Sequence, residues 1–520
     1  MTTTPLAPDD EPVVGADSVV EVAGADAELV VEAIPDAELE AAVDAATGGG
    51  NLVIGLLMVS TFVVILNETL MGVALPTLMD GLSISASTAQ WLSTGFMLTM
   101  AVVIPATGIL LERFTSRAMF IAAMSCFSTG TLLAAVAPGF GVLMVGRVVQ
   151  AGGTAIMIPL LMTTVLNTVA PHKRGQMMGL ISVVIGVAPA IGPTISGLIL
   201  EVASWRWIFL FVLPIALFSL ALGARKIRNV TVTRDVRVDA FSIVLSILGF
   251  GGLIYGLASI GESANGHAPV PLWLPLTIGA VALAGFVARQ IALQRTDRAL
   301  LDLRPFTNGT FSVSIVLMAI SMLTLFGALI ILPIYLQTVL DLNTLVTGLM
   351  LLPGGLVMGL TAPFAGRVFD RVGPRPIVIP GVAIISASLW AMTVLDESSA
   401  GALVIATHLG LSLGFGLMLT PLMTSALGSL KQSLYSHGSA IVSTVQQLAG
   451  AAGTALFITM LATQTAAQED KGASETVAAA SGVHAAVLVG AAISLLAIVL
   501  SFFIRRPAGG PAVEGQLPVH

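Results

Sequence analysis

The sequence is poor in charge. Only 10% of its 520 residues are Asp, Glu, Lys or Arg, whereas 56% are hydrophobic. A soluble domain carries about a quarter of charged residues, so a soluble globular fold is excluded. Apolar blocks long enough to cross the hydrocarbon core of a bilayer recur between residues 51 and 504. These blocks do not alternate apolar and polar residues, as the strands of a membrane barrel do. The sequence therefore predicts an all-α integral membrane protein.

Residues that bind metals or catalyse reactions are also scarce. The single cysteine, Cys126, cannot form an intrachain disulfide, and no two of the six histidines lie three or four positions apart. This spacing offers no metal site, so we expect neither a metal nor another cofactor. No lysine follows a glycine, which excludes the phosphate-binding loop of an ATP-driven pump. An enzyme is not expected, a membrane enzyme or sensor is the least favoured function, and no nucleic-acid partner is expected.

Basic residues are absent from the first 48 positions, which carry twelve acidic residues. Low hydrophobicity combined with charge of one sign predicts disorder. A signal peptide would begin with basic residues followed by an apolar stretch, and neither is present. We therefore predict a disordered acidic cytoplasmic tail over residues 1–48, with a regulatory or partner-binding role as the alternative. A second disordered tail is predicted over residues 507–520.

The positions of the basic residues set the number of helices and their orientation. With the N-terminus inside, 19 of the 22 Lys and Arg residues fall in cytoplasmic loops, where basic residues concentrate. A missed helix would reverse every later loop, so the pattern supports fourteen spans and two cytoplasmic termini in the cell membrane. We also predict a mobile external loop over residues 465–482. The predicted spans lie near residues 52–76, 88–111, 118–137, 141–166, 175–200, 205–225, 239–261, 271–293, 310–340, 346–366, 376–395, 401–428, 437–464 and 483–504.

An internal repeat divides these spans. Residues 108–117 and 366–375 both read Gly-x-x-x-acid-Arg-x-x-x-Arg and follow the second and tenth predicted helices. The repeat predicts two six-helix bundles, residues 49–230 and 301–506, with an inserted two-helix segment at 231–300. Related halves around a substrate path are common in secondary transporters. The acid and arginines of each turn can hold the cytoplasmic face shut, or they can simply cap helix ends. The candidate gate residues are Gly108, Glu112, Arg113, Arg117, Gly366, Asp370, Arg371, Gly373 and Arg375.

Two ionisable residues lie well inside predicted spans, namely Glu68 in the first and Arg147 in the fourth. A charge near the bilayer centre costs about 2.5–3.5 kcal/mol on insertion scales, so it usually faces a partner or a cavity. An apolar environment favours the neutral form of a carboxyl group, whereas a nearby arginine favours the ionised form. Such a group can carry a proton, so we assign Glu68 and Arg147 to proton coupling. The alternatives are a static ion pair and a Glu68 that lies close enough to the outer surface to be hydrated. Candidate residues of the substrate path are Asn67, Gln90, Trp91, Gln150, Gln337 and Gln446.

The fifth predicted helix is rich in glycine and proline. Glycines allow helices to approach closely, and a proline inside a helix removes a backbone hydrogen bond. We therefore predict a hinge or a seal between the two bundles, with ordinary glycine-rich membrane packing as the alternative. The candidate hinge residues are Gly186, Pro189, Gly192, Pro193 and Gly197.

Together these motifs resemble the fourteen-helix drug:proton antiporter branch of the major facilitator superfamily over residues 50–505. Residues 108–117 resemble the cytoplasmic motif after helix 2, and residues 143–155 resemble the helix 4 motif. Residues 179–197 resemble the helix 5 antiporter motif, which is associated with exporters. Residues 66–76 resemble the helix 1 motif, and their Asn-Glu-Thr form is similar to the lincomycin-resistance-like subgroup.

This resemblance implies a major-facilitator-type fold and a proton-coupled exporter of drugs or other amphipathic small molecules. Many members of the branch have Asp where Asn67 stands, so the acid of this sequence, Glu68, lies one position later. The alternative is an exporter dedicated to one endogenous metabolite, such as an antibiotic or a siderophore. The expected partners are a small-molecule substrate, protons and membrane lipid, and the protein is expected to function as a monomer.

Overall fold

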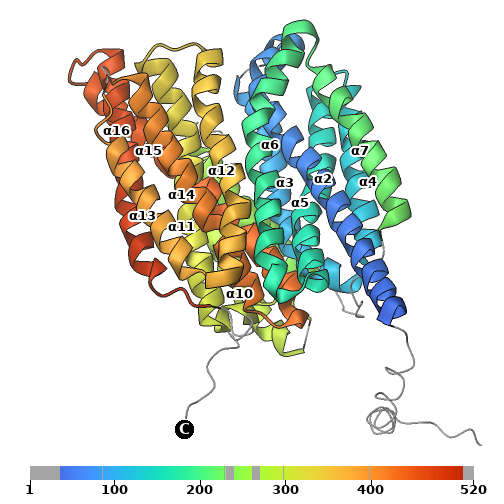
Figure 1. The fold of residues 1–520 in the computed structure, drawn as a ribbon. Coiled ribbons are helices and arrows are strands. Elements are labelled where there is room, and N and C mark those ends of the chain that lie inside the picture. The colour runs from blue at the N-terminus through green and yellow to red at the C-terminus, as the bar shows by residue number, and fades with distance from the viewer. Residues whose placement is uncertain are drawn as a thin grey trace, which may run out of the picture. The chain divides into compact units, whose positions relative to one another are not determined.

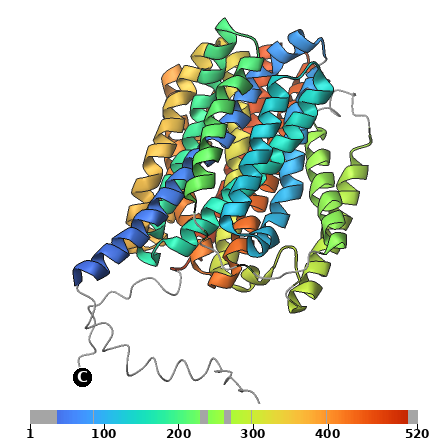
Figure 2. The same ribbon diagram turned by 90° about the vertical axis from the view of Figure 1, so that its right-hand side faces the viewer.

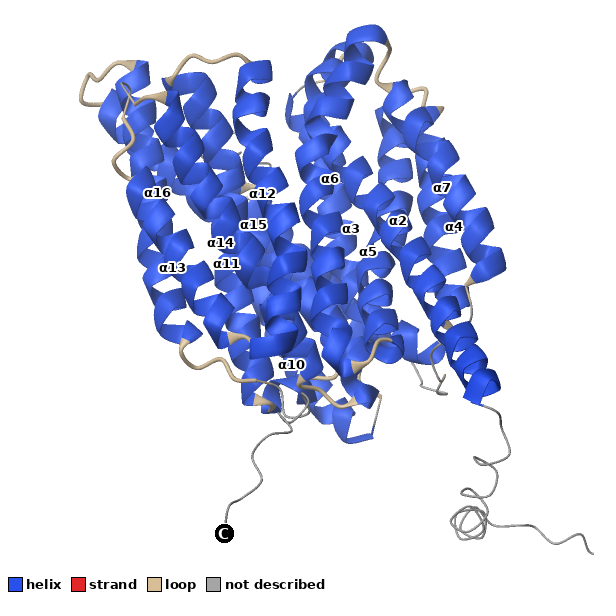
Figure 3. Cartoon of the chain, viewed as in Figure 1, coloured by secondary structure: helices blue, strands red, loops and turns tan. Residues whose placement is uncertain are grey.

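The computed structural model describes residues 36–84, 86–227, 229, 233, 239–260, 270–296, 298–396 and 399–506. Over these residues the regular structure is entirely helical (Figure 3). The chain divides into two compact units, residues 1–52 and 53–520. The described part of the first unit, residues 36–52, forms the beginning of one long helix. The predicted disordered tail over residues 1–48 is therefore wrong over residues 36–48, which are helical. Residues 1–35 and the second predicted tail, residues 507–520, lie outside the described residues.

Each of the fourteen predicted spans corresponds to one long helix in the described part of the chain. Among the described residues, thirteen of these helices are long and apolar enough to cross a membrane by length and composition. The fourteenth helix is α6. The helix α11 continues into a π-helical turn, Tyr335–Val339. The helices are α2 (Asp36–Leu82), α3 (Ala86–Arg113), α4 (Ser116–Ala135), α5 (Phe140–Thr168), α6 (Arg174–Val202), α7 (Arg206–Lys226), α8 (Ala240–Ala258), α10 (Trp273–Leu293), α11 (Gly309–Ile334), α12 (Thr344–Val372), α13 (Arg375–Met392), α14 (Gly401–Gly428), α15 (Tyr435–Glu469) and α16 (Glu475–Ser501).

One predicted loop is wrong. Residues 465–482 were expected to connect the last two spans, but α15 continues to Glu469 and α16 begins at Glu475. Ser474 caps the new helix, because its hydroxyl accepts a hydrogen bond from the Val477 amide. The sequence here is rich in Ala and Gln, which lower the mean hydropathy but are good helix formers. The helices therefore extend beyond their apolar segments.

Within residues 53–520, the helices pack as two groups. The N-terminal bundle is formed by α2 to α7 and the C-terminal bundle by α11 to α16 (Figure 1). Between the bundles, α6 packs extensively on α12, and α3 packs on α15. The intervening pair, α8 and α10, packs on itself, and α8 also contacts α3 and α15, at the flank of the bundles (Figure 2).

A partly exposed ion pair joins α8 to α10. Asp239 caps α8, because its Oδ2 accepts from the Ser242 amide at 2.9 Å. Arg289 on α10 donates to both oxygens of the same carboxyl, from Nε to Oδ2 at 2.7 Å and from Nη2 to Oδ1 at 2.9 Å. The Arg289 guanidinium thereby holds the pKa of the Asp239 carboxyl well below its ordinary value.

The Asp239→Asn substitution is expected to destabilise the protein near neutral pH by about 1 kcal/mol, since a partly exposed pair is screened by solvent. A carboxyl group whose pKa falls on folding contributes stability above its unfolded pKa of about 3.9, and this stability is lost as the pH falls toward the folded value. The difference in thermal unfolding between wild type and variant should therefore shrink below about pH 4. Asp80→Asn, at an exposed end of α2, is the control, and a difference independent of pH would contradict the prediction.

Candidate functional site

Arg147 lies deep inside the N-terminal bundle, with only 1% of its surface exposed. Its Nη1 donates to Gln150 Oε1 at 2.7 Å and its Nε donates to the Leu92 carbonyl at 3.4 Å. The guanidinium carbon lies 4.0 Å from the ring centroid of Phe96, close enough for a cation–π interaction. Gln150 in turn donates to the Thr131 hydroxyl at 2.8 Å. Contacts from α3, α4 and α5 therefore fix a positive charge in an apolar interior.

Glu68 on α2 is half-buried and belongs to the same bundle as Arg147. Among the described residues the two side chains do not form a direct ion pair, so the carboxyl is not held by the guanidinium. Asn67, beside Glu68, is fully buried, and neither polar atom of its side chain has a partner in the described part of the chain. Buried polar groups normally find partners, and one without a partner calls for an explanation. The structure thus brings Arg147 and the predicted path residue Gln150 into direct contact, and it places Glu68 beside the predicted path residue Asn67 in the same bundle.

The next residue, Thr69, contacts α6. A Cβ atom on Gly192 would collide with the Thr69 side chain, so only glycine allows α6 to approach α2 this closely. Ser196 on α6 also donates to the Leu70 carbonyl at 2.9 Å. The glycine-rich helix predicted from the sequence therefore packs directly beside the Asn67–Thr69 segment.

Another face of α6 packs on α12 of the C-terminal bundle. A Cβ atom on Gly179 would lie 2.8 Å from both the Ala362 carbonyl oxygen and the Pro363 Cα. A Cβ atom on Gly186 would lie 3.1 Å from the Met358 Cε. These two glycines therefore allow α6 and α12 to pack closely. The predicted role of this helix as a hinge or a seal stays a prediction. Of the other hinge candidates, Gly197 faces open space, and the side chains of Pro189 and Pro193 lie outside the described residues.

The acid of the second repeated turn, Asp370, reaches across to the N-terminal bundle. Its Oδ1 accepts from the Gly175 amide and its Oδ2 from the Gln176 amide, both at 2.9 Å. These amides lie in the first turn of α6, where the local residue Lys173 supplies no side-chain cap. A carboxylate satisfies the free amides of a helix N-terminus and is favoured by the helix dipole.

The acid of the first repeated turn makes an analogous contact in the opposite direction. Glu112 Oε1 lies 3.4 Å from Nε2 of His437, which lies in the first turn of α15. Gly108 packs against the same histidine, since a Cβ atom would lie 2.6 Å from the His437 Nδ1. The His437 Nδ1 accepts from the Asp302 amide at 3.3 Å. Each acid of the repeat therefore contacts the first turn of a helix in the opposite bundle.

The starts of α6 and α15 also meet. Arg174 donates from Nη1 to the Tyr435 hydroxyl at 3.0 Å, and each residue is the first of its helix. Deeper in the interface, the hydroxyls of Thr163 and Ser439 lie 2.9 Å apart. We call this side of the second unit the basic face, because it carries the arginine-containing ends of α3 and α12. The contacts of Asp370, Glu112 and Arg174 close the basic face between the bundles.

The predicted gate arginines behave differently from the acids. Arg113, Arg117 and Arg371 are exposed. Arg375 donates to the Ile504 carbonyl at 2.7 Å and to the Phe502 carbonyl at 3.1 Å, within the C-terminal bundle. Among the predicted gate residues, the contacts across the bundles that the described part of the chain shows are therefore made by the acids Glu112 and Asp370 and by the glycines Gly108 and Gly366. None of these four arginines makes such a contact there.

The remaining path candidates are spread more widely. Trp91 stacks on Tyr255 of α8, with ring centroids 5.6 Å apart. Gln446 on α15 donates to the Met318 sulfur at 3.6 Å. Gln337 is exposed in the π-helical turn after α11, and the Gln90 side chain lies outside the described residues.

A family model described as Major Facilitator Superfamily matches residues 57–454. The chain belongs to the major facilitator superfamily. It is therefore a multi-pass membrane transporter. It is 40% identical over 470 residues to the lincomycin resistance protein LmrB of Listeria monocytogenes, covering 89% of this chain and 99% of the relative. It is 41% identical over 458 residues to the uncharacterized MFS-type transporter YcnB of Bacillus subtilis, covering 88% and 95%.

The fold is also similar to solved transporter structures. The crystal structure of the human organic anion transporter MFSD10 aligns with a TM-score of 0.62 and 13% sequence identity. The alignment covers 87% of this chain and 99% of the human protein. At this identity the similarity establishes the shared fold.

Proposed function

We propose that this superfamily member is a proton-coupled exporter, an antiporter of drugs or other amphipathic small molecules across the cytoplasmic membrane. The carrying observation is an acid, Glu68, within a membrane-spanning helix of the N-terminal bundle, where it follows the fully buried Asn67 and shares the bundle with the buried Arg147. Intramembrane charges are costly and mark ion or proton pathways. The likeness to a protein named for lincomycin resistance supports a drug as substrate.

The packing around Glu68 supplies a route from protonation to movement. Thr69, the next residue, packs on Gly192 of α6, and α6 also packs on α12 of the other bundle. A change in the charge of Glu68 therefore acts beside the helix that joins the bundles. The unpartnered amide of Asn67 offers a donor and an acceptor to a substrate. In this proposal the basic face and both termini lie on the cytoplasmic side of the membrane, and protons enter from the outside. The protein functions as a monomer.

Transport in proteoliposomes tests this function. Purified protein should move lincomycin uphill when a pH gradient is imposed, and an ionophore that collapses the gradient should stop the movement. Liposomes without protein provide the background. Uphill transport that continues after the gradient is collapsed would overturn the proposed proton coupling. Transport of a single compound from a panel of unrelated drugs would favour the dedicated metabolite exporter.

A further inference from the structure

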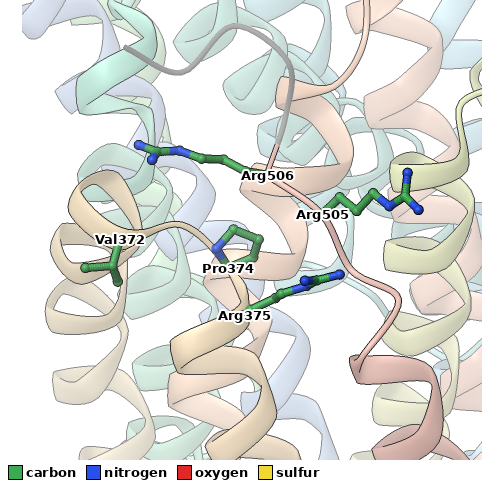
Figure 4. Close-up of a pocket in the computed structure, with 5 residues that line it drawn as sticks. All are labelled: Val372, Pro374, Arg375, Arg505 and Arg506. Atoms are coloured by element: carbon green, nitrogen blue, oxygen red, sulfur yellow. The ribbon is translucent and has the colours of Figure 1, made fainter. Parts of the chain in front are cut away.

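A pocket of about 340 Å³ lies on the basic face, apart from Glu68 and Arg147. Its lining is formed by the turn between α12 and α13 and by the residues that follow α16 (Figure 4). Three of its five lining residues are arginines, and none is acidic. The lining residues are Val372, Pro374, Arg375, Arg505 and Arg506.

The backbone around this arginine pocket is held in place. Gly373 ends α12 with φ of 84°, a conformation that favours glycine, and so turns the chain into α13. The Arg506 side chain lies against this glycine, 3.5 Å from where a Cβ atom would stand. Arg375 ties the opposite wall, since it donates to the carbonyls of Phe502 and Ile504. The three arginines therefore line a pocket whose backbone walls are fixed, with Arg506 extending to one side of it and Arg505 and Arg375 to the other (Figure 4).

Exposed apolar side chains flank the charged pocket. Phe502 and Phe503 follow directly after α16 and are 56% and 60% exposed, and Val372 on the pocket wall is 50% exposed. The pocket thus lies where a membrane-spanning helix ends, at the boundary between apolar and charged surface. An ordinary phosphate ion would use the arginines and leave the apolar flank without a partner.

We propose that this arginine pocket binds the headgroup phosphate of an anionic phospholipid, with the acyl chains against Phe502, Phe503 and Val372. Guanidinium groups match phosphate oxygens in a two-pronged geometry. Basic pockets beside membrane helices on the cytoplasmic side attract anionic lipid. The site is independent of the substrate and of proton coupling, so it stands whatever compound the transporter moves.

Lipid binding to the full-length protein in detergent tests the site. The probe is a short-chain fluorescent phosphatidylglycerol, read by polarisation, with the phosphatidylcholine analogue for comparison. The double variant Arg505→Gln/Arg506→Gln should weaken phosphatidylglycerol binding at least about tenfold, because it removes two of the three positive charges that line the pocket. The affinity of the variant Arg505→Lys/Arg506→Lys should fall between that of this variant and that of wild type. Lysine keeps the positive charge but lacks the paired N–H donors of the planar guanidinium group.

The control is Arg225→Gln/Lys226→Gln, which removes two exposed charges at the end of α7. Its affinity should change less than about twofold, because these residues lie outside the pocket. An equal loss of phosphatidylglycerol affinity in the pocket variant Arg505→Gln/Arg506→Gln and in this control would show that any surface charge contributes equally. That result would contradict the proposed site. Equal affinity for the phosphatidylcholine analogue would do the same. Full displacement of the probe by equimolar inorganic phosphate would assign the pocket to a soluble anion instead of a lipid.

Discussion

Glu68→Gln is expected to reduce uphill export in proteoliposomes to the background of liposomes without protein. Glutamine keeps the size and hydrogen-bonding capacity of the side chain but cannot take up and release a proton at neutral pH. The region around it should remain intact, because Arg147 is held by Gln150, Leu92 and Phe96 without a direct ion pair to Glu68. The variant should therefore express at normal levels and still bind lincomycin, while a pH gradient no longer drives transport.

Two further variants sharpen this test. Glu68→Asp keeps a proton-carrying group and should retain part of the activity. Glu201→Gln removes an exposed acid near the end of α6 and should transport like wild type. If Glu68→Gln still accumulates lincomycin uphill in response to a pH gradient, the proton-carrier role of this residue is wrong. Loss of lincomycin binding along with transport would instead indicate a damaged substrate site.

The sequence predicted the spans well because each apolar block must satisfy its backbone hydrogen bonds as a helix inside a membrane. The distribution of arginines and lysines then supported the count of fourteen spans independently of hydropathy. The ends of the helices were less predictable. Both α15 and α16 continue past the apolar region to Glu469 and from Glu475, where helix propensity and a serine cap determine the structure.

The partners of the gate acids were not predictable from the sequence. The repeat identified both acids. The partner of Glu112 is His437. The partners of Asp370 are two backbone amides of α6, which lie more than 190 positions away in the sequence. A backbone amide carries no sequence signal. His437 is a single histidine, and only the docking of α3 on α15 brings it to Glu112. One feature could have indicated where the bundles meet. Arg174 and Tyr435 each begin the fifth helix of their bundle, and each follows a short 3-10 turn.

Gly179→Leu is expected to open the basic face and abolish export. Even a Cβ atom at this position would lie 2.8 Å from backbone atoms of Ala362 and Pro363, which cannot rotate away as a side chain can. Overpacking of this kind costs about 1–3 kcal/mol, and separation of α6 from α12 relieves it. The separation would also pull the amides of Gly175 and Gln176 away from Asp370. The equilibrium between the states with a closed and an open basic face would then shift toward the open state.

The accessibility of a buried cysteine reports this opening. Ser439 is fully buried in the interface beside Thr163, and Cys126 is the only native cysteine. In a Cys126→Ser/Ser439→Cys background, Gly179→Leu should accelerate labelling by a membrane-impermeant maleimide applied to the basic face. The matched control is Gly197→Leu on the same helix, where a Cβ atom meets open space, so both labelling and export should stay near wild type. Similar effects of the two leucines would show that α6 is sensitive to any added side chain and would remove the special role of the α6–α12 contact.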